Sequence, residues 1–222
     1  MLTLKNLSVS VESTEIISDI SLSFNSGQVT VITGANGGGK STLAAVMMGI
    51  SGYETQGNIL LDGNDITDWP VEKRAQAGIF LAYQYPIEVP GLSIKTFLSH
   101  AYRSCKGSAL PLTELDKKIV DAFHKVGLPA DYINRNLHEG FSGGQKKRLE
   151  LVQMLVLEPR IIILDEIDSG LDAQGMAMLI GVITDYRHAF PGAIFIIITH
   201  HRALFEPLAA DVQLVMHAGR FV

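Results

Sequence analysis

The segment GANGGGKST at residues 34–42 constrains the fold of this chain more than any other feature. It follows the strand-like run VTVIT, precedes the helical composition of LAAVMMGI, and matches the pattern G-x-x-x-x-G-K-[ST]. Glycines let backbone N–H groups curl around a phosphate, and the N-terminus of the following helix adds partial positive charge. The segment therefore predicts a phosphate-binding loop between a strand and a helix, as in nucleotide-binding α/β proteins.

Every position of this loop has an expected role in holding a nucleotide. The predicted binding residues are Gly34, Ala35, Asn36, Gly37, Gly38, Gly39, Lys40, Ser41 and Thr42. Lys40 should reach the β- and γ-phosphates and assist catalysis, Ser41 should offer its hydroxyl to Mg²⁺, and Thr42 should bind the α-phosphate. The alternative is a merely flexible glycine loop, which the flanking strand and helix disfavour.

Four acids lie in ILDEIDSGLD (163–172), directly after the apolar run RIIIL. That run has the length and composition of a strand covered on both faces. Asp165 ends the strand, where parallel sheets bind ligands, so we expect it to hold Mg²⁺, largely through water. Glu166 follows and is placed to accept a proton from an attacking water. The alternative is that both acids only end a strand at the surface.

Strand-like and helical segments alternate along the rest of the chain. Apolar and polar residues alternate in the first part, and short buried strands are expected around 77–84 and 193–200. Pro86, Pro90 and Gly91 are expected to break regular structure. The pattern predicts an α/β fold with a mainly parallel sheet and an antiparallel β region. Its nucleotide-binding core should comprise residues 1–84 and 156–222, with an inserted helical subdomain at 85–155.

Composition excludes several functional classes. The net charge is −5 and no long basic run is present, so no nucleic-acid partner is expected. The apolar stretches, such as AIFIII (193–198), are far shorter than the ~20 residues that a membrane-spanning helix needs. We therefore expect no direct membrane insertion. The single cysteine, Cys105, fits a reducing cytoplasm and is expected to be a packing or surface thiol rather than a nucleophile.

The segment FSGGQKKR (141–148) precedes a helical segment, so its free N–H groups and hydroxyl can face an anion. The phosphate loop, SGGQ, LDE and a later TH, in this order, resemble the nucleotide-binding domain of ABC-type ATPases. The resemblance implies that Ser142, Gly143, Gly144 and Gln145 contact ATP held by a second copy. Two chains would then form an ATP-dependent, head-to-tail homodimer with two ATP molecules between them. The alternative is a plain helix cap and turn.

The same resemblance assigns further residues. Gln84, in AYQYP, corresponds to the glutamine that contacts Mg²⁺ and the attacking water, and His200, in ITHH, to the histidine near the γ-phosphate. His201 is not expected to be catalytic. Asp172 ends the loop SGLD (169–172), which is expected to touch the second copy.

One family element is missing from this sequence. Many ABC-type ATPases stack adenine on an aromatic residue before the phosphate loop, but the region SVSVESTEII (8–17) contains none. Val11 can supply only an apolar contact. Base recognition is therefore expected to be weak, and the choice of ATP follows from the resemblance.

Three stretches are similar to the SufC-type ATPases of iron–sulfur cluster assembly: DEIDSGLD (165–172), FLAYQYPIEVPGLS (80–93) and EGFSGGQKKR (139–148). Most transporter ATPases have Pro and Thr where this chain has Ile167 and Asp168. The resemblance implies a cytoplasmic ATPase that docks on SufB and SufD scaffold proteins through the surface around YPIEVPG. Gln145 stands where SufC-type ATPases usually have Glu.

Three other functional classes share some of these motifs. A transporter ATPase subunit, which needs a membrane partner, is the main alternative. Chromosome-organising relatives carry a long coiled coil between the two nucleotide motifs, and no heptad array fills that interval here. A non-catalytic ATP binder is disfavoured because Glu166 and His200 are both present.

Asp168 is the acid that this chemistry does not require. Lys146 and Lys147 follow the SGGQ motif, and we expect one of them to pair with Asp168. Such an ion pair would hold the acidic segment, including Glu166, out of position in a resting monomer.

Overall fold

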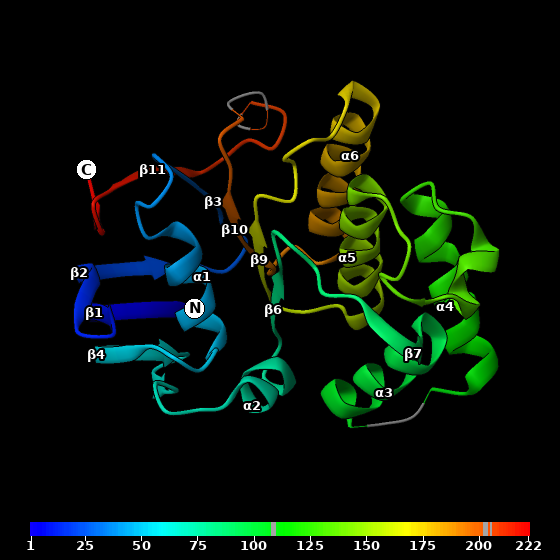
Figure 1. The fold of residues 1–222 in the computed structure, drawn as a ribbon, viewed down its shortest axis with the longest axis horizontal. Coiled ribbons are helices and arrows are strands. Elements are labelled where there is room, and N and C mark those ends of the chain that lie inside the picture. The colour runs from blue at the N-terminus through cyan, green and yellow to red at the C-terminus, as the bar shows by residue number, and fades with distance from the viewer. Residues whose placement is uncertain (108–109, 202–203, 205) are drawn as a thin grey trace.

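A mainly parallel sheet runs through the middle of the computed structural model, which describes residues 1–107, 110–201, 204 and 206–222 (Figure 1). In spatial order its strands are β12 (Arg220–Phe221), β11 (Val212–His217), β3 (Val29–Thr33), β10 (Ile194–Ile198), β9 (Ile161–Asp165) and β6 (Ile79–Ala82). Neighbouring strands are parallel except β11 and β12, which form an antiparallel hairpin. Both faces of the sheet are covered, and β10 and the first four residues of β9 are accordingly all apolar.

A second, antiparallel sheet covers one face together with the helix α1 (Lys40–Met48). Its strands, in order, are β2 (Thr14–Phe24), β1 (Leu2–Val11), β4 (Glu54–Leu61) and β5 (Asn64–Asp65). The apolar alternation along β1 changes phase between Leu4 and Leu7. A bulge at this point, with Asn6 at a φ of 47°, keeps both leucines on the buried face.

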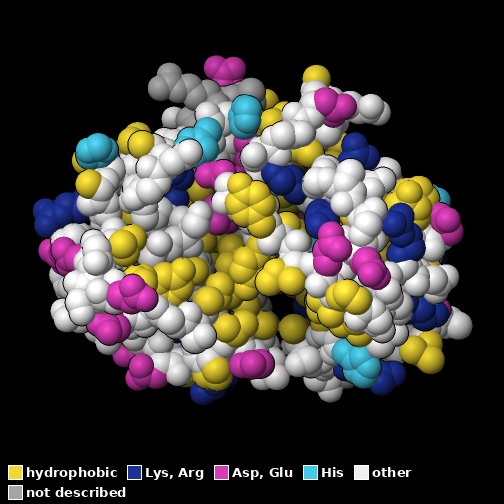
Figure 2. Space-filling view, viewed as in Figure 1, with side chains coloured by type: hydrophobic (Ala, Val, Ile, Leu, Met, Phe, Trp, Pro, Cys, Tyr) yellow, Lys and Arg dark blue, Asp and Glu magenta, His cyan; other side chains and the backbone are white. Residues whose placement is uncertain are grey.

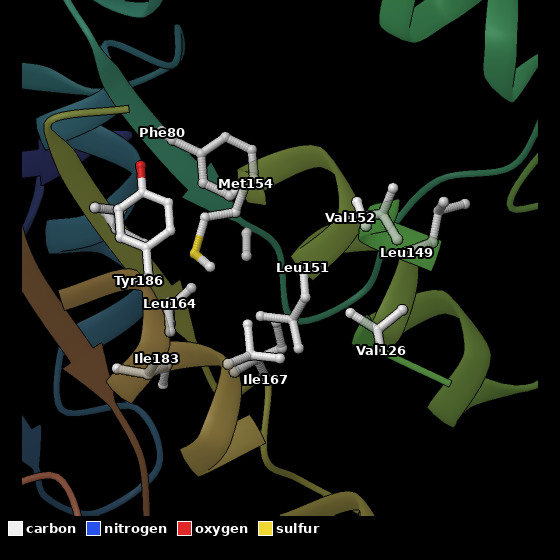
Figure 3. Close-up of a cluster of buried hydrophobic side chains, with 14 of the residues drawn as sticks. Phe80, Val126, Leu149, Leu151, Val152, Met154, Leu164, Ile167, Ile183 and Tyr186 are labelled. Carbon is white, nitrogen blue, oxygen red and sulfur yellow. The ribbon is translucent and has the colours of Figure 1, made fainter. Parts of the chain in front are cut away.

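Helices cover the opposite face of the parallel sheet. They are α5 (Gly143–Leu157) and α6 (Ala173–Ala189), followed outward by α3 (Ile94–Lys106), α4 (Leu112–Lys125) and the short η1 (Ala130–Asn134). Figure 3 shows Leu151 and Met154 of α5 packed with Leu164 of β9 and Ile183 of α6. The short helix α2 (Val71–Gln76) contacts β6 and α3. This apolar packing fixes α5 and the end of β9 to one another.

The segment after β6 differs from the prediction. Pro90 and Gly91 lie inside β7 (Val89–Ser93), although the sequence predicted that they break regular structure. β7 pairs with β8 (Asn136–Leu137) only at its two ends, with a register shift between them. The proline and glycine lie in this irregularity, where the ladder needs no N–H donor.

The architecture is the α/β fold that the sequence predicts, with a parallel core, an antiparallel β region and a helical region (Figure 1). Residues 85–155 contain β7, α3, α4, η1, β8 and most of α5. The division into a core and a helical subdomain stays a prediction. Within the described residues, no helix combines the length and the apolar character that crossing a membrane would require.

Candidate functional site

The phosphate loop joins β3 to α1, and its glycines are required by close backbone contacts. Gly34 has a φ of 139°, and a Cβ there would lie 2.0 Å from the carbonyl oxygen of Met216. Gly39 has a φ of 101° and caps α1. The backbone N–H of Gly219 donates to the carbonyl of Gly38 (3.1 Å). The β11–β12 hairpin therefore packs directly on the loop, and side chains at these glycines would push it away.

Lys40 is buried at the start of α1, with 4% of its surface exposed. Its ammonium group donates to the backbone carbonyls of Gly34 (2.8 Å) and Ala35 (2.9 Å). A phosphate in the loop would offer this ammonium charge-assisted hydrogen bonds, which are stronger than bonds to neutral carbonyls. The lysine is thus already positioned where the sequence motif requires it.

Asp165 is buried at the carboxyl end of β9. Burial raises the pKa of this carboxyl, a hydrogen bond from Ser41 partly opposes the rise, and the charge of Glu166 adds to it. Its Oδ1 has no hydrogen-bond partner among the described residues. A buried carboxylate with a free oxygen beside a hydroxyl is a donor set that suits Mg²⁺, which prefers oxygen ligands. Asp165 and Ser41 could therefore hold this cation.

Three residues that were predicted separately form one hydrogen-bonded chain. The Oε2 of Glu166 accepts a hydrogen bond from the amide of Gln84, and its Oε1 lies 3.0 Å from Nε2 of His200. Glu166 has a φ of 49°, and its backbone N–H donates to the carbonyl of Ile198 (3.0 Å). The turn after β9 is therefore tied to the end of β10. The carboxylate remains 14% exposed, which leaves it accessible to water.

The SGGQ segment forms the first turn of α5. The Ser142 hydroxyl accepts a hydrogen bond from the Gln145 N–H (3.3 Å), and the Gln145 side chain accepts one from the Ser142 N–H (2.9 Å). This reciprocal pair is a capping box. Ser142 and Gly143 are exposed, and no hydrogen bond among the described residues joins this segment to the phosphate loop.

Comparison with known proteins gives a consistent result. The sequence profile described as "ABC transporter" matches residues 17–169, which is more than half of the chain. A probable ABC transporter ATP-binding protein of Streptococcus pyogenes is 42% identical over all of this chain and 87% of its own length. Vegetative protein 296 of Bacillus subtilis is 41% identical over all of this chain and 85% of its own length.

The chain belongs to the ABC transporter family. A solved dimeric ATP-binding cassette in a post-hydrolysis state, bound to ADP and Pi, superposes with a TM-score of 0.86. The match covers 100% of this chain and 98% of that chain at 18% identity, and so supports the fold. The protein is an ABC-type ATPase, and ATP is its nucleotide.

In this ABC ATPase, the expected ion pair between Asp168 and a lysine of α5 is not formed, and that prediction was wrong. Lys146 pairs instead with Glu88 (2.7 Å). Lys147 is buried and donates to the backbone carbonyl of Glu166 (3.0 Å). Consecutive residues of a helix point about 100° apart, so only one of the two lysines faces the acidic segment. That lysine bonds the carbonyls of the segment rather than its carboxylates.

Asp172 has a role within its own chain. It is the N-cap of α6, and its Oδ1 accepts a hydrogen bond from the backbone N–H of Gly175 (2.7 Å). Such a cap stabilises a helix by about 1 kcal/mol. The predicted contact of Asp172 with a second copy stays a prediction.

An apolar cavity of about 490 Å³ opens beside the Gln84 loop, between α2, β6 and α3. Figure 2 shows apolar side chains gathered in a hollow between the β-rich and helical parts. Tyr83 lines the cavity, and Tyr85 and Ile87 follow it with 79% and 81% of their surfaces exposed. Cys105 also lines the cavity, and burial raises the pKa of its thiol, which disfavours the reactive thiolate.

Proposed function

We propose that this chain is a cytoplasmic SufC-type ATPase that changes the shape of a SufB–SufD-like scaffold during iron–sulfur cluster assembly. The observation that carries the proposal is the exposed apolar surface formed by Tyr83, Tyr85 and Ile87, next to the apolar cavity. Neighbouring large apolar side chains that are exposed together are typical of surfaces that another protein covers. Gln84 lies within this stretch, so a partner bound here would sit beside the hydrolysis site.

The proposed chemistry is the hydrolysis of ATP to ADP and phosphate. The phosphate loop and Lys40 hold the phosphates, and Ser41, Gln84 and Asp165 hold Mg²⁺. Bound Mg²⁺ would neutralise charge on the phosphate oxygens. Glu166 takes the proton of the attacking water, with His200 beside it at 3.0 Å.

A second copy completes the site in this proposal. Ser142, Gly143, Gly144 and Gln145 of one chain contact the γ-phosphate of ATP held by the other. The exposure of Ser142 and Gly143 supports this role, because the N-terminus of α5 is open to an external anion. The solved cassette with the same fold is also dimeric.

Nucleotide binding can reach the docking surface through α5. This helix begins with SGGQ, and Glu150 within it accepts a hydrogen bond from the backbone N–H of Tyr83 (3.4 Å). A shift of the helical region 85–155 relative to the core would therefore move Tyr83 and its neighbours. The motion of Tyr83 and its neighbours would be transmitted to a scaffold protein bound at the cavity.

Replacement of the proposed base tests the chemistry. We expect Glu166→Gln to abolish phosphate release and to accumulate as an ATP-bound dimer in light scattering with MgATP. Hydrolysis at the wild-type rate would show that Glu166 is not the base.

Affinity capture from the native host tests the partner. The matched control is Tyr85→Ser combined with Ile87→Ser, which removes the apolar surface but touches none of the proposed catalytic groups. We expect two soluble scaffold proteins with the wild type and neither with the control. Recovery of a multi-span membrane protein would instead support a transporter subunit, the function that the name of the Streptococcus pyogenes relative gives to that protein.

A further inference from the structure

Asp168 is built into the protein interior although the hydrolytic chemistry does not require it. Only 1% of its surface is exposed, and its Oδ2 accepts a hydrogen bond from the hydroxyl of Thr199 (2.5 Å), which is fully buried. Its Oδ1 has no hydrogen-bond partner among the described residues. Burying a carboxylate costs free energy unless the group is paired and hydrogen-bonded, and this one has a single hydrogen-bond donor in the described part of the chain. The hydrogen bond from Thr199 is therefore the main contact that compensates the burial of this acid.

The Thr199 hydroxyl is both a hydrogen-bond donor and an acceptor. It donates to Asp168 and accepts from the backbone N–H of His201 (2.8 Å). His200, whose imidazole contacts Glu166, lies between Thr199 and His201 in the sequence. The backbone of the histidine segment is thus held at Thr199 by one carboxylate. The bond to an ionised acceptor is stronger than a bond to a neutral hydroxyl would be.

The acidic segment is held firmly on its other side. Ile167 is 1% exposed, and Figure 3 shows it packed with Leu151 of α5. The ammonium group of Lys147, also on α5, donates to the carbonyls of Glu166 and Ser169. Asp168 therefore projects from a backbone that the start of α5 fixes in place. It can serve as a rigid support for the histidine segment.

We infer that Asp168 is a positioning residue, which acts through Thr199 to hold His200 against Glu166. The inference rests on the roles proposed above for Glu166 and His200. It adds to those roles, because it concerns the pair Asp168–Thr199 and not the groups that touch the reacting atoms. The imidazole of His201 is 3.9 Å from Asp168 and more than half exposed, so it contributes less to this support than the buried hydroxyl does.

A matched pair of substitutions tests the inference. Thr199→Val keeps the shape of the side chain but removes the hydroxyl, whereas Thr199→Ser keeps the hydroxyl. We expect the valine variant to lose about tenfold or more in kcat with little change in KM, because its site binds ATP but holds His200 poorly. The serine variant should retain most of the wild-type kcat. Equal kcat for the two variants would overturn the inference.

A spectroscopic readout separates positioning from general destabilisation. The imidazole signal of His200, assigned with a His200→Ala variant in a ¹H–¹⁵N correlation spectrum, should shift in Thr199→Val and remain in place in Thr199→Ser. An unshifted signal in a folded valine variant would also overturn the inference.

Asp168→Asn is the second variant, for use if Thr199→Val fails to fold. It retains an oxygen acceptor without the charge, and we expect a kcat between those of the wild type and of Thr199→Val. Wild-type kcat in Asp168→Asn would overturn the inference, which rests on the strength of the bond from Thr199 to the carboxylate. Failure of the proposed base is recognised independently, since Glu166→Gln would then remain active whatever the Thr199 variants do.

Discussion

The two glycine-containing segments of the site are organised in opposite ways. The second half of the phosphate loop is enclosed by its own chain: Gly38, Gly39 and Lys40 are buried, and the β11–β12 hairpin packs on the glycines. The SGGQ segment is exposed, and its polar groups are bonded to one another in a capping box. The chain thus fixes the base of the phosphate loop by its own contacts and leaves the SGGQ segment as a stable surface. In our proposal, only another copy brings the two together.

The largest expected effect comes from breaking the enclosed region. Lys40→Ala removes the ammonium group from the phosphate loop, and we expect ATP affinity to fall by about a hundredfold, since charged hydrogen bonds are lost. Isothermal titration with a non-hydrolysable ATP analogue measures this. Lys5→Ala, at an exposed position of β1, is the control and should bind like the wild type. Affinity within threefold of the control would mean that Lys40 does not bind the phosphates.

The next effect comes from the exposed region. Ser142→Ala should leave ATP binding by a single chain unchanged but reduce turnover by about tenfold or more, because the serine acts on nucleotide held by the other copy. The decisive measurement is a mixture of Ser142→Ala with Lys40→Ala. A head-to-tail heterodimer has one intact site, so an equimolar mixture should recover up to about a quarter of wild-type turnover. A mixture no more active than the separate variants would contradict the shared site.

The sequence predicts the enclosed region well because its chemistry requires fixed residue types at fixed spacing. The strand, glycines and lysine of residues 34–42 form one local unit, and the apolar run before Asp165 identifies a buried strand. What the sequence could not predict depends on contacts between distant segments. The packing of Met216 on Gly34 is one case. The bonds from Lys147 to the carbonyls of Glu166 and Ser169 are another, since helical periodicity gives the side of a helix but not which atom a lysine will meet.

A smaller effect concerns the stability of the enclosed region. Burial raises the pKa of Asp165, so the native state disfavours its charged form. The stability that this carboxyl contributes is full below its unfolded pKa and is lost as pH rises through the raised native pKa. Asp165→Asn should therefore raise the free energy of unfolding by about 1 kcal/mol at pH 7 without nucleotide, even though it lowers Mg²⁺-dependent turnover.

Thermal unfolding of Asp165→Asn between pH 5 and pH 8 measures this trade-off. The gain of Asp165→Asn over the wild type in free energy of unfolding should shrink as the pH is lowered. Asp185→Asn, at an exposed position of α6, removes the same charge and should give no comparable gain. Equal shifts in the two variants would show that burial of Asp165 does not cost stability.

The smallest effect tests whether the exposed region is stabilised by its own capping box. The side chain of Gln145 accepts a hydrogen bond from the Ser142 N–H at the positive end of α5. In Gln145→Glu a carboxylate can accept the same bond and also interacts favourably with the helix dipole, so we expect about 0.5 kcal/mol of added stability in urea denaturation. Gln56→Glu, on the exposed part of β4, adds the same charge away from a helix end. If both variants change stability equally, a carboxylate at position 145 gains nothing from its place at the start of α5.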